Sequence, residues 1–263
     1  MNLRLLPCLA LAFAVSAFGQ LQPPNAEGIA MGHVHLTVRD VEGNLKFFKL
    51  LGGVPITNGP LQLIQFPNFY VMLQQGEPSA GTVDSTVNHF GFQVRSMNEW
   101  LPQWQTAGLK LEPTNRPTQV YMRTPDDIRV EILEEPALAY PVAGHHIHFA
   151  TTDIPAMQAW YAKTFGGVSG KRAQFDTDDL PGINLTFSGP GSAYPPAPTK
   201  GRGLDHIGFE VKNLPAFITK LEAAGNKMDR PYTKIANSSV AVAFFTDPWG
   251  TYIELTEGLP PSQ

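Results

Sequence analysis

A short motif built around histidine recurs four times, and it restricts the possible folds of the chain more than any other feature. The copies are Gly32-His33-Val-His-Leu-Thr-Val, Asn88-His89-Phe-Gly-Phe-Gln-Val, His145-His146-Ile-His-Phe-Ala-Thr and Asp205-His206-Ile-Gly-Phe-Glu-Val. Successive matching histidines are 56, 57 and 60 residues apart, and a glycine follows each of them after 19 or 20 residues. Self-similarity at a nearly fixed period is typical of repeated structural units. The sequence therefore predicts four modules, each a strand, a helix and about three more strands.

The helix of each module is predicted to be short and amphipathic. In the third module Met157, Tyr161 and Phe165 recur at helical spacing, with Asp153 as the expected N-cap and Gly166 as the expected C-cap. We expect these apolar side chains to lie in the core.

Strand parity predicts the direction of the histidines. In the first copy Val34, Leu36 and Val38 share one face of the strand, and His33 and His35 share the other. The same alternation holds in the other three copies. The histidine at the repeated position should therefore lie on the face of the sheet that the helix does not cover.

The last strands of the second and fourth modules add a carboxylate to that face. Glu131 and Glu254 each lie between apolar neighbours of opposite parity, and the matching positions of the third and first modules are expected to be Asn184 and Met72. Two histidines and one carboxylate are a common metal-binding set that leaves coordination positions open for water or substrate.

The first residues predict export. A positively charged start, an apolar stretch from Leu5 to Ala17 and small residues before Gln20 are typical of a secretory signal peptide, assigned to residues 1–19. About 13 apolar residues are too few to span a bilayer, which takes roughly 20. We expect a secreted or periplasmic mature chain that begins near Gln20 and has no membrane span.

Composition excludes several other classes of function. Lysine and arginine total 19 against 23 acidic residues, which is unlike a nucleic-acid-binding protein. Cys8 is the single cysteine, so neither an intrachain disulfide nor a cysteine-based metal site is possible. A small molecule is the expected partner, and the oligomeric state stays open.

The repeated motif, together with Asp247-Pro248-Trp-Gly250-Thr-Tyr-Ile-Glu254, resembles the vicinal oxygen chelate superfamily. That superfamily includes glyoxalase I, type I extradiol dioxygenases and bleomycin-resistance proteins. The resemblance covers about residues 30 to 257. It implies an α+β fold of βαβββ modules that pair into half-open, cup-shaped barrels, with four modules in two domains. The sequence places an N-terminal domain at 30–136, with modules 30–80 and 86–136, and a C-terminal domain at 142–257, with modules 142–190 and 203–257.

The resemblance also implies a divalent metal ion, of unknown identity among Fe, Mn, Zn and Ni. Carried over to the C-terminal domain, the ligands are His146, His206 and Glu254; in the N-terminal domain they are His33, His89 and Glu131. The superfamily can also pair the first module with the fourth and the second with the third. That arrangement regroups the ligands and still gives each cup two histidines and one glutamate.

Three functions stay open at this point. The first is a metal-dependent lyase, isomerase or dioxygenase acting on a small oxygen-chelating substrate, with Glu210, His148 and His35 as candidate acid–base groups. The second is a binding module of the bleomycin-resistance type without catalysis, and the third is a scaffold. The segment before Asp247 lacks the histidine and tyrosine of extradiol enzymes, and Asn184 or Met72 stands where glyoxalase I has a second carboxylate. Of the two cups, the sequence favours the one that contains Glu254.

Overall fold

The computed structural model describes residues 21–260, so the predicted signal peptide lies outside the described residues. Four modules follow one another, each with the order strand, helix and three strands, as the repeat predicts. The first two modules contain β1 (Ile29–Val38), α1 (Val41–Leu50), β2 (Val54–Asn58), β3 (Leu61–Phe66), β4 (Phe69–Gln75), β5 (Val87–Val94), α2 (Met97–Thr106), β6 (Lys110–Pro113), β7 (Gln119–Arg123) and β8 (Arg129–Glu134). The last two contain β9 (Val142–Ala150), α3 (Ile154–Phe165), β10 (Val168–Arg172), β11 (Phe175–Leu180), β12 (Ile183–Ser188), β13 (Leu204–Val211), α4 (Leu214–Ala223), β14 (Met228–Lys234), β15 (Ala241–Thr246) and β16 (Tyr252–Glu257).

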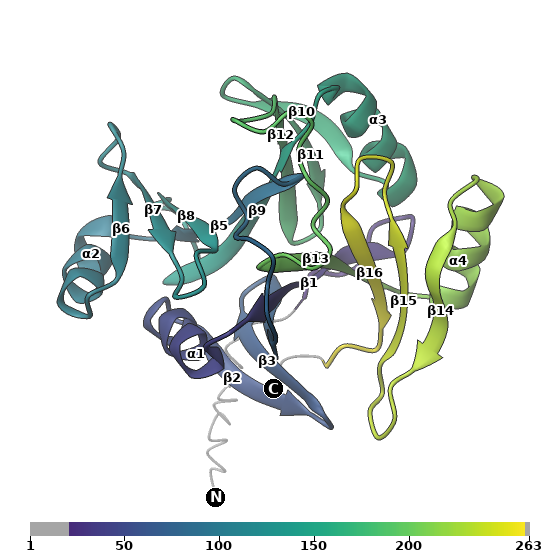
Figure 1. Cartoon of the computed structure of the whole chain (residues 1–263), viewed down its shortest axis with the longest axis horizontal. Coiled ribbons are helices and arrows are strands. Elements are labelled where there is room, and N and C mark those ends of the chain that lie inside the picture. Colours follow the sequence, from purple (N-terminus) through teal and green to yellow (C-terminus); the bar gives the residue numbers. More distant parts are fainter. Residues whose placement is uncertain (1–20, 261–263) are drawn as a thin grey trace, which may run out of the picture.

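The modules pair across the two halves of the chain. One eight-stranded sheet has the order β14-β15-β16-β13-β1-β4-β3-β2, and the other has β10-β11-β12-β9-β5-β8-β7-β6. At their centres β1 runs antiparallel to β13, and β5 runs antiparallel to β9. Figure 1 shows β1 and β13 side by side at the middle of the molecule. Each sheet therefore contains one module from residues 30–136 and one from residues 142–257.

We call the faces of these sheets that the helices do not cover cup 1–4 and cup 2–3, after the modules that form them. Hydrogen bonds between two long connections accompany this pairing. The Ser79 amide donates to the Gly201 carbonyl at 2.8 Å, and the Gly203 amide donates to the Ala80 carbonyl at 2.7 Å. The segment that leaves the first module is thus tied to the segment that enters the fourth, which brings β1 and β13 together.

One continuous apolar core lies beneath the helices. The strand residues predicted to face the helices, such as Leu36, Phe92, Phe149 and Phe209, are fully buried in it. The capping predictions for α3 are confirmed, because the Asp153 side chain accepts from the Ala156 amide and Gly166 adopts a left-handed conformation with φ 74°. Each sheet therefore buries one face and leaves its histidine face for the cup.

Among residues 21–260, no helix combines the length and apolar character needed to cross a membrane. The longest described helix, α3, has 12 residues.

Candidate metal centres

Cup 2–3 brings two histidines from different modules onto one carboxylate. His89 Nε2, on β5, lies 2.9 Å from Glu131 Oε2, and His146 Nε2, on β9, lies 3.0 Å from the same oxygen. His148 completes a group of four whose ligand atoms lie within 4.8 Å of one another. His89, His146 and Glu131 are buried.

Cup 1–4 repeats this arrangement. His33 Nε2 on β1 and His206 Nε2 on β13 lie 2.8 and 2.9 Å from Glu254 Oε2 on β16. His35 is the fourth member of this group. The two groups are related by the module repeat, with His33 matching His146, His206 matching His89 and Glu254 matching Glu131.

The structure brings together all six predicted ligands, but in the regrouped sets. Assigning His33 to His89 and Glu131 was wrong, and so was assigning His146 to His206 and Glu254. The physical reason is the pairing of β1 with β13 and of β5 with β9, which separates sequence-adjacent modules into different sheets. The alternative pairing left open by the sequence is the one that the structure adopts.

Glycines in the neighbouring strands make room for two of the histidines. His146 lies opposite Gly91, and a Cβ at residue 91 would lie 2.2 Å from His146 Cε1. His33 lies opposite Gly208, and a Cβ there would lie 2.0 Å from His33 Cε1. Such distances are far inside van der Waals contact. Gly91 and Gly208 stand two residues after His89 and His206, so the repeated His-x-Gly sequence supplies one ligand and the space for another.

Side-chain oxygens fix the orientation of the other two histidines. His206 Nδ1 lies 2.7 Å from Asp205 Oδ1, and His89 Nδ1 lies 2.9 Å from Asn88 Oδ1. Because a carboxylate and an amide oxygen only accept, both Nδ1 atoms donate. The neutral rings then turn the Nε2 lone pair toward the glutamate, which is the tautomer of a metal ligand. A lone pair facing a carboxylate oxygen at this distance requires a cation between them, either a proton or a metal ion. The Nε2 lone pairs of His89 and His206, each beside a carboxylate oxygen, are therefore donors that fit a divalent metal ion.

His146 is held differently, through a chain of side chains that ends at Arg172. Arg172 donates to His145 Nε2, and His145 Nδ1 lies 2.8 Å from His146 Nδ1. In its neutral form His145 therefore carries its proton on Nδ1 and donates to His146, which leaves the His146 proton on Nε2 facing Glu131. Binding of an ion by His146 through Nε2 requires that proton to move to Nδ1. His145 must then accept at Nδ1 and carry its own proton on Nε2, so Arg172 has to give up its hydrogen bond to His145.

Electrostatics keeps both glutamates ionised. Burial acts to raise the pKa of Glu131 and of Glu254, but the hydrogen bonds and charges of their two histidine partners lower each pKa overall. Burial and the nearby histidines lower the pKa of His35 to about 3 and that of His148 to about 2. The two additional histidines are therefore neutral around pH 7, and each cup holds one anionic oxygen donor beside nitrogen donors.

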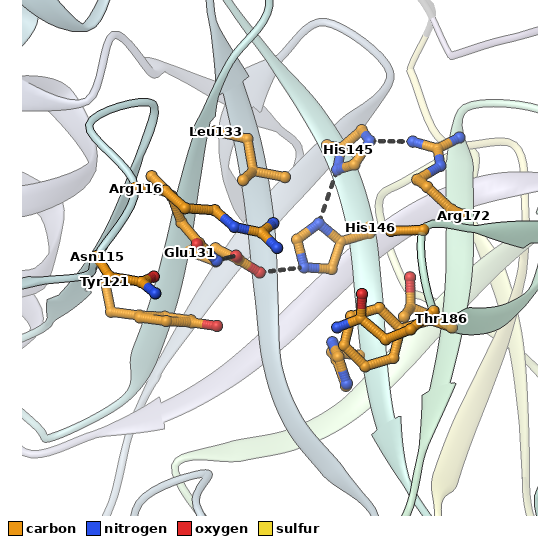
Figure 2. Close-up of a pocket in the computed structure, with 14 residues that line it drawn as sticks. Asn115, Arg116, Tyr121, Glu131, Leu133, His145, His146, Arg172 and Thr186 are labelled. Carbon is orange, nitrogen blue, oxygen red and sulfur yellow. Dashed lines mark hydrogen bonds and ion pairs between the residues drawn. The ribbon is translucent and has the colours of Figure 1, made fainter.

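An open cavity of about 340 Å³ lies against the Glu131 group. Figure 2 shows Glu131 and His146 between Tyr121 and Arg116 on one side and Arg172 and His145 on the other, and all six line the cavity. His148 and Thr186 also line it. Gln119 donates to Glu131 Oε1, so both oxygens of this carboxylate are engaged. A small molecule in this cavity would contact the donor set directly.

Cup 1–4 is filled by the protein's own apolar side chains. They form a separate buried cluster of Leu63, Tyr70, Met72, Val240, Val242, Phe244, Tyr252 and Leu259. The C-terminal segment contributes Leu259, and Tyr70 donates from its hydroxyl to the Pro260 carbonyl at 2.7 Å. The sequence favoured the Glu254 group as the functional site, but apolar side chains of the protein itself cover that group. The open cavity of about 340 Å³ lies beside Glu131 instead.

The three predicted acid–base groups occupy different surroundings. His148 lines the open cavity, and its Nε2 lies 2.9 Å from Ser188 Oγ. His35 lies in cup 1–4, where its Nε2 is 3.2 Å from Gln74 Oε1. Glu210 accepts from the amides of Gly258 and Leu259 at 2.7 and 3.2 Å, so its carboxylate holds the C-terminal segment.

Strand register corrects one equivalence and shows which residues sequence reasoning missed. Each glutamate pairs with the residue two after the repeated histidine, Gly91 or Gly208, and Met72 and Thr186 pair with the matching His35 and His148. Met72 was therefore matched correctly, whereas Asn184, which pairs with His146, was wrong and Thr186 is the matching residue. Gln119 and Tyr121 were missed, although they alternate with the buried Val120 and Met122 and so share a face with Glu131. Arg116 and Arg172 lie where β-hairpins turn, and no periodic pattern marks such positions.

The comparisons agree with this architecture. Residues 143–255 match the model of the Glyoxalase/Bleomycin resistance protein/Dioxygenase superfamily. Glyoxalase I from Zea mays superposes with a TM-score of 0.65 at 16% identity, over 87% of this chain and 92% of that chain. A candidate dioxygenase from Bacillus subtilis subsp. subtilis str. 168 superposes with a TM-score of 0.67 at 14% identity, over 92% of this chain and 87% of that chain. No curated protein sequence matches the chain. At these identities the solved structures establish a shared four-module fold.

Proposed function

We propose that this chain, a four-module member of the glyoxalase/bleomycin resistance protein/dioxygenase superfamily, is a metal-dependent enzyme that acts on a small molecule in cup 2–3. The observation that carries the proposal is that Glu131, His146 and His148, three of the four residues of the Glu131 group, line an open cavity. The reaction is of the lyase, isomerase or dioxygenase type, on a substrate with two neighbouring oxygen atoms.

His89, His146 and Glu131 would hold the ion. When bound there, a divalent metal ion supplies Lewis-acid stabilisation of negative charge on substrate oxygens. Glu131 stays ionised because its two histidine partners lower its pKa. Its Oε1 is held by Gln119, which leaves Oε2 facing the two imidazoles. The protein thus fixes the donors before a substrate arrives.

Tyr121 and His148 are the groups that would handle protons at the substrate. Burial, followed by the charge of Glu131, raises the pKa of Tyr121 to about 12, so its hydroxyl keeps its proton at neutral pH. It lines the cavity and can donate a hydrogen bond to a substrate oxygen. His148 is neutral, and its Nε2 hydrogen-bonds Ser188. Because burial and the charges of His89 and His146 lower its pKa to about 2, it would be a weak proton acceptor at the substrate.

The proposal is tested by binding of a bidentate oxygen probe to a cobalt-loaded protein. Acetohydroxamic acid is neutral in solution near pH 7, carries its two oxygens on adjacent carbon and nitrogen atoms, and releases its hydroxyl proton to solvent when it chelates a metal ion. It is expected to change the visible spectrum of the Co²⁺ form. His146→Ala should abolish the change, and His33→Ala, the matching substitution in the filled cup, should preserve it. A spectrum that does not respond in the parent protein would contradict substrate chelation in cup 2–3. Binding without turnover of any α-dicarbonyl, hydroxyacid or catechol compound would favour a sequestration module.

We also propose that the protein is exported through residues 1–19. Mass spectrometry of the mature chain is expected to show an N-terminus near Gln20, and an intact Met1 on secreted or periplasmic material would contradict export with cleavage.

A further inference from the structure

We propose that cup 2–3 selects anionic substrates, with a carboxylate or phosphate group bound by Arg116 and Arg172 while the rest of the molecule lies over the Glu131 group. This inference rests on the proposed function, because it names the substrate class of the same cavity. Both arginines line the cavity together with His146 and Glu131.

Arg116 offers a guanidinium without a carboxylate partner among residues 21–260. Its backbone is fixed by the loop between β6 and β7, where its amide donates to Thr114 Oγ1 at 3.0 Å and its carbonyl accepts from the Gln119 amide at 3.2 Å. Figure 2 shows the side chain extending over the cavity toward Glu131. A guanidinium held over a cavity in this way presents several parallel N–H donors, the geometry that carboxylates and phosphates match.

Arg172 approaches from the opposite wall, at the end of β10. Its side chain is 48% exposed, it donates to His145, and it lies 3.5 Å from Asp179 Oδ1. Asp179 is itself engaged, because its Oδ1 accepts from Asn184 at 2.7 Å. The ion pair with Asp179 is long and solvent-exposed, so Arg172 can also pair with an anion in the cavity.

The balance of charge in the cavity is positive. Glu131 is the one acidic residue among its lining residues, and its charge is already directed to His89, His146 and Gln119. A third guanidinium, that of Arg129, stacks 3.7 Å from the centre of the Tyr121 ring, and its Nε lies 3.9 Å from Glu112 Oε2. A neutral substrate would leave Arg116 without an anionic partner, whereas an oxyanion would pair with Arg116 and Arg172.

The filled cup provides an internal comparison. Strand register matches Arg172 with Asn58 and Tyr121 with Phe244, and it matches Gln119 with Val242 and Thr186 with Met72. Arg116 lies three residues before Gln119, and Ser239 lies three residues before Val242, so these two residues also match. The donor sets are the same in the two cups, but none of the five matched positions of the filled cup holds a charged residue, whereas two of them hold arginine in the open cup. Gln119 and Arg172 also hold the donor set, through Glu131 and His145. Arg116 has no such contact among the described residues, and recognition of an anion accounts for it.

The test measures anion binding without the metal ion. Inorganic phosphate, succinate and the neutral analogue succinamide are titrated calorimetrically into the full chain after removal of metal with a chelator. Arg116→Ser and Arg172→Asn carry the residues of the filled cup, and Arg230→Gln removes an exposed arginine of the other sheet as a control.

Phosphate or succinate is expected to bind, and the tighter of the two identifies the group that the cup prefers. Each cavity variant should weaken binding by about tenfold or more, the control should not, and succinamide should not bind measurably. Equal binding by the parent and both cavity variants, or no binding of either anion, would overturn the inference. Because these titrations use metal-free protein, their failure would leave the hydroxamate test of the proposed function intact. Conversely, anion binding with no cobalt response would retain the arginine site and reject the metal-dependent function.

Discussion

Gly91 lies directly against the imidazole of His146, and a Cβ at residue 91 would come within 2.2 Å of Cε1 and 2.7 Å of Nδ1. Gly91→Ala is therefore expected to displace His146 and to empty cup 2–3 of metal while leaving the other cup loaded. Metal content per chain after identical dialysis checks this. The substitution should also destabilise the fold by roughly 1–3 kcal/mol, which is typical of overpacking.

Gly189→Ala is the matched control, because a Cβ there would meet no atom within 4 Å. Full metal content in Gly91→Ala would mean that the position of His146 does not decide whether the ion binds.

The carboxylate behind His206 should strengthen metal binding in cup 1–4. Asp205 accepts from His206 Nδ1, and Asn88 accepts from His89 at the matching position of cup 2–3. Asp205→Ala is expected to weaken metal affinity of cup 1–4 by roughly 10- to 100-fold, measured by competition with a chelator. Asp205→Asn should lose much less, because an amide oxygen already performs this task at Asn88. Equal losses in the two variants would show that charge, rather than orientation of the ring, is what Asp205 supplies.

Glu210 should make stability depend on pH. Burial raises the pKa of this carboxyl from 4.5 to about 7, although hydrogen bonds from Thr256, Gly258 and Leu259 oppose the rise. The folded chain then keeps the proton that the unfolded chain releases, so stability is lost as pH rises from about 4.5 through 7. The loss from this group amounts to about 3 kcal/mol at pH 8.

Glu210→Gln is therefore expected to be more stable relative to the parent at pH 8 than at pH 5, by about 2 kcal/mol in the free energy of urea unfolding. Glu222→Gln, which changes an exposed residue of α4, should show no such difference. An identical pH dependence in the parent and Glu210→Gln would remove this carboxyl as its source.

Local pattern was sufficient to predict the modules and the direction of their side chains. The repeated histidines, the alternation around Val34 and Leu36, and the caps of α3 each depend on residues close together in sequence. All six expected ligands lie in the two donor groups, because strand parity, which is a local pattern, decides which face of the sheet each side chain lies on. Their metal binding stays a prediction.

The pairing of modules could not be predicted in this way. It depends on contacts such as that between Ser79 and Gly201, which are 122 residues apart and carry no periodic signal. The difference between the cups likewise depends on Leu259, a residue of the C-terminal segment that fills one of them. Arg116 and Arg172 lie at hairpin turns, where neither strand parity nor helical spacing predicts which way a side chain points.

The most direct test of the account is whether His33 shares an ion with Glu254 or with Glu131. The parent chain is expected to hold two metal ions, and each single substitution, His33→Ala, Glu254→Gln or Glu131→Gln, should remove one. The decisive measurement is the metal content of two double variants after identical loading and dialysis. His33→Ala with Glu254→Gln should still hold one ion, because both changes affect cup 1–4, and His33→Ala with Glu131→Gln should hold none. The reverse result, with no ion in the first double variant and one in the second, would contradict the pairing of modules on which both centres depend.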